Sequence, residues 1–201
     1  MNNLTQYLIS IGALREKNII AAFEKIDRKD FVLPEYEDQA YEDHPLPIGH
    51  GQTISQPYTV AFMLELLHPQ NGERILDIGS GSGWTTALLS DIAGQSGKVW
   101  GVEIIPELVK FGQDNLIKYD FPQTKIAEAG KILGLPREAP FDRILVSAAS
   151  ETLPKELIKQ LKIGGILVMP VKTAIYRIKK ISLAGLETKT FDGFTFVPLR
   201  L

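Results

Sequence analysis

The stretch Arg74-Ile75-Leu76-Asp77-Ile78-Gly79-Ser80-Gly81-Ser82-Gly83 decides the fold class of this chain. An apolar run ends there in a loop with glycine at every second position, which is typical of a strand that turns tightly into a helix. A second apolar run, Val99-Trp100-Gly101-Val102, ends in Glu103. A glycine loop lets a cofactor approach the backbone, and an acid about 20 residues farther on accepts ribose hydroxyls. The two strand ends therefore predict a site for a nucleoside cofactor.

The spacing of the glycines separates the classes of cofactor. A dinucleotide-binding loop reads G-x-G-x-x-G. Counted from Gly79, its third glycine falls where this chain has Trp84, which disfavours a nicotinamide oxidoreductase. A Walker loop is excluded because no Gly-Lys-Ser/Thr follows. The observed G-x-G-x-G has the form seen in methyltransferases that use S-adenosylmethionine. A plain glycine-rich turn is the alternative, and Glu103 argues against it.

Length and composition limit the domain count and the class of partner. The 201 residues, 44% of them hydrophobic, predict one domain over residues 1–201. Within it, residues 1–56 are expected to form N-terminal helices and a substrate loop, and residues 57–201 the cofactor-binding core and C-terminal strands. A net charge of −2 argues against a nucleic-acid partner. No coiled-coil heptad or apolar patch can be read that would settle the oligomeric state, and a monomer is the expected state.

The same composition predicts a cytoplasmic enzyme without a metal. No apolar run approaches the ~20 residues of a membrane span, and the N-terminus does not read as a secretory signal. Cysteine is absent, which excludes disulfides and thiolate nucleophiles. The three histidines show no spacing typical of metal ligands.

The order of elements predicts an α/β fold. Strands are expected near 73–78, 98–103, 124–127, 142–147 and 165–171, with helices near 84–93, 106–118 and 151–161 between them. Such alternation predicts a parallel sheet with helices on both faces and a ligand at the carboxyl ends of the strands. Before this core we expect a helical segment over the first thirty residues, an irregular stretch over 35–56 and a helix from Pro57. After it we expect two antiparallel strands, at 174–184 and 193–199.

Motifs along nearly the whole chain resemble the protein-L-isoaspartate O-methyltransferase family, in its bacterial type. The most specific motif is Gly51-Gln52-Thr53-Ile54-Ser55-Gln56-Pro57. Others are Ala40-Tyr41-Glu42-Asp43, Pro45-Leu46-Pro47-Ile48-Gly49, Leu76-Asp77-Ile78-Gly79, Glu138-Ala139-Pro140-Phe141-Asp142, Gln160-Leu161-Lys162-Ile163-Gly164-Gly165 and Phe196-Val197-Pro198-Leu199. The resemblance implies a Rossmann-like, seven-stranded methyltransferase sheet with altered order at its C-terminal end.

The resemblance also implies an activity. In this family a methyl group passes from S-adenosylmethionine to the free carboxylate of an L-isoaspartyl or D-aspartyl residue in a peptide or protein, and S-adenosylhomocysteine is released. The ester then cyclises to a succinimide, which reopens in part to normal aspartate. The acceptor carboxylate has a pKa of about 4, so it is ionised at neutral pH and needs no general base.

Residue roles follow from the motifs. Ser55 matches the active-site serine of the family, and its hydroxyl can hold one carboxylate oxygen while the other attacks. The plainer interpretation of Ser55 is a helix N-cap. Substrate contacts are expected from Gln52, Thr53, Ile54 and Ser55. Cofactor contacts are expected from Asp77, Gly79, Ser80, Gly81, Gly83, Glu103, Ile104 and Glu128.

Two segments depart from the family pattern. The family usually has Gly-Asp-Gly after its third core strand, whereas this chain reads Ala127-Glu128-Ala129-Gly130-Lys131. Glu128 replaces the missing aspartate if the loop is shifted by a residue or two. Pro170-Val171-Lys172 has lysine where the family usually has glycine. Two alternative functions therefore stay open: a methyltransferase with another carboxylate or small-molecule acceptor, and a non-enzymatic interaction protein.

Overall fold

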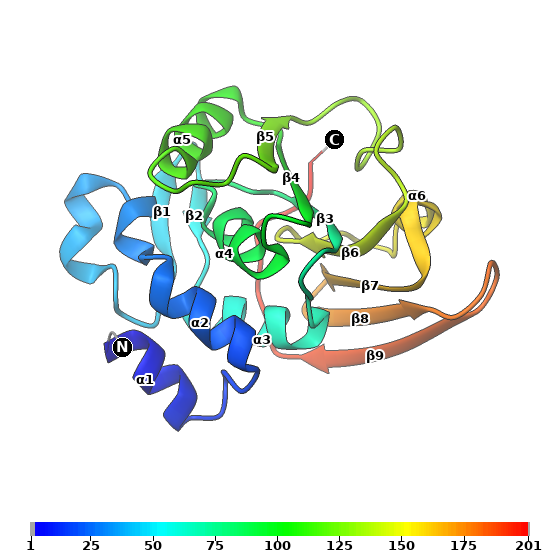
Figure 1. Ribbon diagram of the computed structural model, residues 1–201, viewed down its shortest axis with the longest axis horizontal. Coiled ribbons are helices and arrows are strands. Elements are labelled where there is room, and N and C mark those ends of the chain that lie inside the picture. Colours follow the sequence, from blue (N-terminus) through cyan, green and yellow to red (C-terminus); the bar gives the residue numbers. More distant parts are fainter. Residues whose placement is uncertain (1–2, 201) are drawn as a thin grey trace.

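The computed structural model describes residues 3–200, and within them seven strands form one sheet in the order β5-β4-β3-β6-β7-β8-β9 (Figure 1). The strands are β3 (Arg74–Ile78), β4 (Lys98–Glu103), β5 (Thr124–Glu128), β6 (Phe141–Val146), β7 (Leu161–Val171), β8 (Ala174–Lys180) and β9 (Leu186–Asp192). The first five strands in this order run parallel to one another. Strand β8 pairs antiparallel with β7, and β9 pairs antiparallel with β8. The predicted seven-stranded, Rossmann-like sheet is confirmed.

Helices cover both faces of the sheet, but unevenly. One face carries the helices α1 (Asn3–Ser10), α2 (Lys17–Lys25), α3 (Pro57–Leu67), α4 (Trp84–Ala93) and α5 (Pro106–Leu116). The other face carries α6 (Lys155–Gln160), which is shorter than predicted, together with apolar side chains of the loop before β6. Both faces of the sheet are apolar because side chains alternate along each strand. In β3, Ile75 packs under the first set of helices, whereas Leu76 and Ile78 pack on the opposite face.

The segment before α3 contains more regular structure than its sequence predicts. Two short 3-10 helices, η1 (Arg28–Phe31) and η2 (Pro34–Gln39), precede an antiparallel hairpin of β1 (Leu46–Gly49) and β2 (Gln52–Ile54). The turn is built from Gly49, His50 and Gly51, all with positive φ. We call residues 46–54 the hairpin. The prediction of an irregular stretch over 35–56 is thus wrong at the hairpin.

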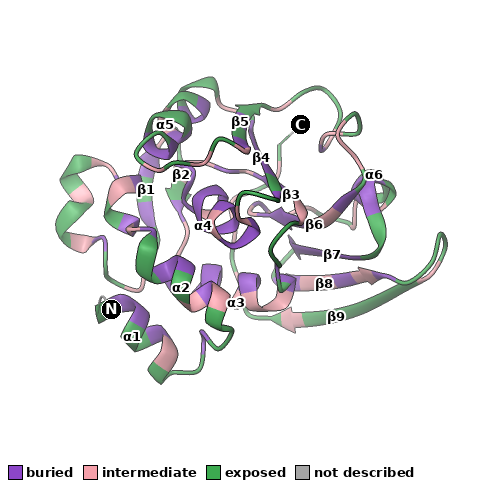
Figure 2. Ribbon diagram, in the orientation of Figure 1, coloured by how far each residue is buried: buried purple, intermediate pink, exposed green. Residues whose placement is uncertain are grey.

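The C-terminal strand prediction is wrong in its position. The second antiparallel strand is β9, at Leu186–Asp192, and β8 ends at Lys180. Figure 2 shows β9 exposed along most of its length, so its side chains give no burial pattern in the sequence. Residues 193–200, which we call the tail, form no strand of the sheet. Within the tail, Val197 O accepts a hydrogen bond from Ala149 N at 2.8 Å and Leu199 N donates one to Ala149 O at 2.7 Å.

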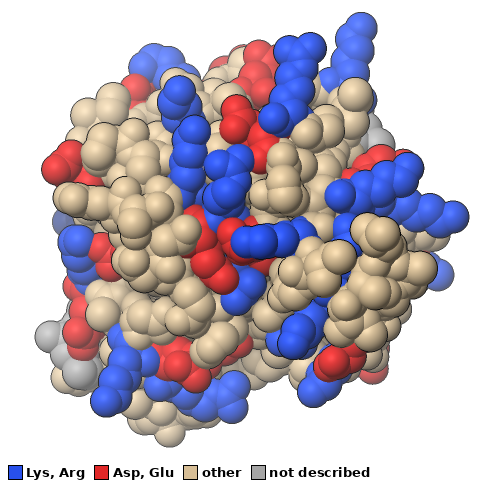
Figure 3. Space-filling model, turned by 45° about the vertical axis from the view of Figure 1, so that its right-hand side comes forward, with Lys and Arg blue, Asp and Glu red and all other residues tan. Residues whose placement is uncertain are grey.

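Two further features bear on the sequence. Lys172, which stands where the family usually has glycine, has φ +54 in the turn between β7 and β8. That left-handed conformation explains why glycine suits the position. Side chains of both charges are interspersed on the face seen in Figure 3. Over residues 3–200, no helix combines the length and the apolar character that a membrane crossing requires.

Candidate functional site

A cavity opens at the carboxyl ends of the parallel strands, where the sequence predicts a ligand. Its empty space, including open solvent at the mouth, is about 1010 Å³. Its wall comes from distant parts of the chain: residues 48, 52–55, 60, 78–82, 84–85, 102–105, 129–130, 132–134, 147–148 and 197–200. The hairpin, the glycine loop, the β4 end and the tail therefore meet around one space.

The glycine loop between β3 and α4 has a backbone conformation that glycine adopts without strain and that other residues adopt only at a cost. Gly81 has φ +51, and a Cβ there would lie 3.1 Å from Ile48 Cδ1 of the hairpin. Gly83 has φ +90 and is the N-cap residue of α4. A Cβ on Gly83 would lie 3.1 Å from the carbonyl oxygen of Gly112 in α5. The loop is thus packed closely between the hairpin and α5.

Glu103 ties the glycine loop to the end of β4. Its side chain is buried, and Oε2 accepts a hydrogen bond from Gly81 N at 3.0 Å. Oε1 accepts from Ile104 N at 2.8 Å and from Ile105 N at 3.1 Å. Glu103 therefore organises the cavity wall itself, in addition to lining the cavity.

Asp77 lies under the glycine loop and is fully buried. Thr85 and Thr86 of α4 donate to its Oδ2 at 2.7 and 2.6 Å. Burial raises the pKa of Asp77 to about 6, against the lowering effect of the two threonine hydroxyls. Its Oδ1 has no hydrogen-bond partner among the described residues. A buried carboxylate oxygen without a donor is a position that a ligand N–H or O–H would satisfy.

Ser55 lines the cavity between β2 and α3. The N-cap residue of α3 is Gln56 and makes no side-chain capping bond, so the interpretation of Ser55 as an N-cap is wrong. The capping role falls to Asp43, whose Oδ1 accepts from Tyr58 N at 2.8 Å. Within residues 3–200, Ser55 Oγ takes part in no hydrogen bond, so the hydroxyl is available to a ligand.

The other predicted site residues separate into two groups. Gln52, Thr53 and Ile54 line the cavity, as do Gly79, Ser80, Gly81 and Ile104. Asp77 and Gly83 lie behind that wall. Glu128 is exposed at the end of β5 and lies outside the lining, although it is the register partner of Glu103. The wall after β5 is formed instead by Ala129, Gly130 and the apolar residues 132–133.

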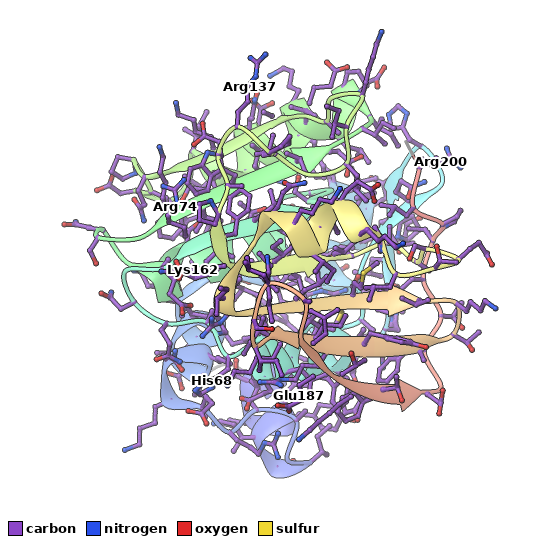
Figure 4. All side chains as sticks on the ribbon, turned by 90° about the vertical axis from the view of Figure 1, so that its right-hand side faces the viewer. His68, Arg74, Arg137, Lys162, Glu187 and Arg200 are labelled. Carbon is purple, nitrogen blue, oxygen red and sulfur yellow. The ribbon has the colours of Figure 1, made fainter. Side chains whose placement is uncertain are left out.

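Some lining residues are not among the predicted site residues, although Val197, Pro198 and Leu199 belong to a motif of the family. The tail contributes residues 197–200, and Figure 4 shows Arg200 on the opposite side of the molecule from His68 and Lys162. Among the described lining residues, Glu103 and Arg200 carry the charges. The motif itself does not say where these residues lie, because only the path of the folded chain brings them to the cavity.

The chain is similar to known proteins over nearly its whole length. The model of the family protein-L-isoaspartate(D-aspartate) O-methyltransferase matches residues 1–200. The chain belongs to this family. A protein-L-isoaspartate O-methyltransferase of Methanopyrus kandleri is 39% identical over 98% of this chain and 89% of its own. One of Aeropyrum pernix is 42% identical over 94% of this chain and 72% of its own.

A solved structure of the same family has the same fold. It is a putative protein-L-isoaspartate O-methyltransferase from Plasmodium falciparum, in complex with S-adenosyl-L-homocysteine. It is 27% identical, covers 100% of this chain and 99% of its own, and superposes with a TM-score of 0.85. The fold expected from the family resemblance is therefore the one this chain adopts.

Proposed function

We propose that this chain transfers a methyl group from S-adenosylmethionine to the free carboxylate of L-isoaspartyl or D-aspartyl residues in damaged peptides and proteins. The ester that forms then closes to a succinimide, which begins repair. The observation that carries the proposal is the single cavity joining the unpaired Ser55 hydroxyl to the glycine loop and Glu103. Family membership and the S-adenosylhomocysteine held by the Plasmodium relative support it.

The residues present fit such a cofactor. Three buried polar atoms around the glycine loop have no partner among the described residues: Asp77 Oδ1, Ser80 Oγ and Trp84 Nε1. Buried polar groups are rarely left unpaired, so this cluster suits a polar ligand. We propose that Asp77 and the glycine loop hold the amino acid end and that Glu103 accepts from the ribose hydroxyls. The apolar residues Ile104, Ile132 and Leu133 would then lie against the base.

When bound, S-adenosylmethionine supplies an electrophilic methyl group on a sulfonium. The chain's own residues need only align the acceptor and exclude water, because the acceptor carboxylate is already ionised at neutral pH. Ser55 Oγ donates a hydrogen bond to one carboxylate oxygen and leaves the other free to attack. The hairpin, with Gln52, Thr53 and Ile54, covers the reacting groups. Glu128 is exposed and lies outside the cavity lining, so we assign it no contact with the cofactor.

The test is methyl transfer from labelled S-adenosylmethionine to a short isoaspartyl peptide, with the aspartyl peptide as control. Selective labelling of the isoaspartyl peptide is the expected result, and Ser55→Ala should lower it strongly. The alternative is transfer to another carboxylate or a small molecule. It would be favoured if S-adenosylhomocysteine stabilises the protein but neither peptide is labelled. At about 100 times its Kd, such a ligand adds about 2.7 kcal/mol to the free energy of unfolding.

We further propose, from the sequence, that residues 1–201 act as one domain, as a monomer and in the cytoplasm.

A further inference from the structure

We propose that Arg28 is a positioning residue for Ser55: it holds the segment that carries Ser55 in its active shape and joins that segment to the helix that follows the glycine loop. The inference rests on the proposed function, since it concerns the same site. Arg28 begins η1, outside the cavity lining, and no motif singles it out.

The contacts of Arg28 are the first observation. The side chain is 2% exposed, and its guanidinium donates to four backbone carbonyls. Nη1 reaches Ala40 O at 2.9 Å and Glu42 O at 3.2 Å. Nη2 reaches His44 O at 2.9 Å and Ser55 O at 3.1 Å. One side chain thus fixes the loop before the hairpin and the residue after it.

The segment around Ser55 is held a second time from Asp43. Its Oδ1 accepts from Tyr58 N, and its carbonyl accepts from Gln56 Nε2 at 3.0 Å. The backbone on either side of Ser55 Oγ is therefore anchored to residues 40–44, and Arg28 anchors residues 40–44 in turn. Because the hydroxyl has no partner of its own, the direction in which it points depends on this backbone.

The other face of the guanidinium contacts the cofactor side of the cavity. Arg28 Cζ lies 5.3 Å from the ring centroid of Trp84, the first residue of α4 and part of the cavity wall. Arg28 therefore touches the acceptor side and the glycine-loop side at once. A cation over an indole face is attracted to it, which favours a fixed separation between the two walls.

Burying the charge of Arg28 costs desolvation free energy, and an apolar side chain could fill the same space without that cost. Burial lowers the pKa of Arg28 to about 10, and the nearby Asp43 acts against that lowering. The guanidinium is thus charged at neutral pH, and it is bonded to carbonyl dipoles rather than to a carboxylate. Nε has no partner. Buried charges are often neutral or unfavourable for stability compared with apolar replacements, and they are best attested as devices that specify one arrangement.

A double-mutant cycle with Ser55 tests the proposal. Arg28→Lys keeps the charge but loses the planar fork that reaches several carbonyls. We expect Arg28→Lys to lower kcat/KM for the isoaspartyl peptide about 10- to 100-fold. The Kd for S-adenosylhomocysteine, measured by calorimetry, should change less than about threefold. In a Ser55→Ala background, the same Arg28→Lys change should cost less than about threefold, because the group it positions is already absent.

The control is Arg143→Lys. Arg143 is also largely buried and pairs with Glu73 at 2.9 Å, but it lies toward the start of β6, outside the cavity lining. We expect it to lower the melting temperature without changing kcat/KM at 25 °C. Asp43→Ala is a second variant at a less buried position. It should lower kcat/KM for the isoaspartyl peptide, and this decrease should also disappear in the Ser55→Ala background.

The outcomes separate the two proposals. Suppose that the wild type is active and that Arg28→Lys and Asp43→Ala lower kcat/KM by the same factor with and without the Ser55 hydroxyl. This result would overturn the positioning role alone. Lower stability with unchanged kcat/KM in these variants would do the same. A wild type that binds S-adenosylhomocysteine but does not label the isoaspartyl peptide would overturn the proposed function, and the positioning role with it.

Discussion

Glu103→Gln should destabilise the protein even without a ligand. The Glu103 carboxylate accepts three backbone hydrogen bonds, from Gly81, Ile104 and Ile105. A glutamine side chain has one oxygen and one NH2 group. If its oxygen keeps the two donors on the β4 side, the NH2 group faces Gly81 N–H, and two donors are opposed. The opposite orientation leaves two backbone N–H groups without an acceptor.

The magnitude follows from this count. A buried N–H without a partner costs about 1–3 kcal/mol, and each remaining bond loses roughly 1 kcal/mol when its acceptor is no longer charged. Burying a neutral amide in place of a carboxylate offsets part of this loss. We expect a net loss of about 2–4 kcal/mol, which lowers the melting temperature by roughly 4–16 °C for a chain of this size.

The measurement is thermal unfolding of the ligand-free protein, followed by titration with S-adenosylhomocysteine. Glu128→Gln is the matched control, because Glu128 is the register partner of Glu103 but is exposed. Glu128→Gln should change neither the melting temperature nor the Kd. If Glu103→Gln unfolds within about 1 °C of wild type, the structural role assigned to the carboxylate is refuted.

Three further predictions concern the sheet and its loops. Burial raises the pKa of Asp77 to about 6, so the Asp77 carboxyl binds its proton more tightly in the folded protein than in the unfolded chain. The free energy of unfolding therefore falls as pH rises from about 4 to 6. Asp77→Asn removes this fall. From pH 4 to pH 7, the free energy of unfolding of the variant should therefore increase by up to about 3 kcal/mol relative to that of wild type. If the difference between variant and wild type is the same at both pH values, the burial argument is contradicted. Gly112→Ala should cost about 1–3 kcal/mol and weaken S-adenosylhomocysteine binding, because its Cβ would lie 2.9 Å from the carbonyl of Gly81. Calorimetry showing normal affinity would mean that the loop yields freely. Lys172→Gly relieves a φ of +54 and should raise the free energy of unfolding by up to about 1 kcal/mol in denaturant titration, whereas a lower midpoint would show that the lysine makes a compensating contact.

The parts of the fold that could be predicted are those with a local cause. The strand, loop and helix from Arg74 to Ala93 follow from apolar alternation and glycine spacing, and the structure has them at those positions. The strand β9 could not be predicted, because its side chains are almost all exposed and it is defined by its pairing with β8. The hairpin could not be predicted for a different reason: its strands have only four and three residues, which is too short for an alternation of apolar and polar residues to be recognised.

The site shows the same division. The residues lining the cavity from the hairpin and the glycine loop belong to contiguous motifs. Arg28 belongs to Asp27-Arg28-Lys29-Asp30, a run that reads as a solvated surface, and only the folded chain shows that its guanidinium is buried. The sequence predicts a cofactor contact from Glu128 if the loop after β5 is shifted, but Glu128 is exposed and lies outside the cavity lining. The path of that loop depends on residues 129–134, which have no regular pattern in the sequence.

The tail gives the cavity a wall whose stability differs from that of the sheet. The tail is joined to the backbone of the other described residues at two places: Gly193 and Phe194 donate to Thr173 O, and residues 197 and 199 share two hydrogen bonds with Ala149. Each inner strand of the sheet, in contrast, is paired along both of its sides. Local opening of such a segment requires far less free energy than global unfolding. Release of the tail removes Val197 to Arg200 from the cavity while the strands remain paired. Mild denaturation therefore has two thresholds: the cavity loses its closure first, and the sheet melts later.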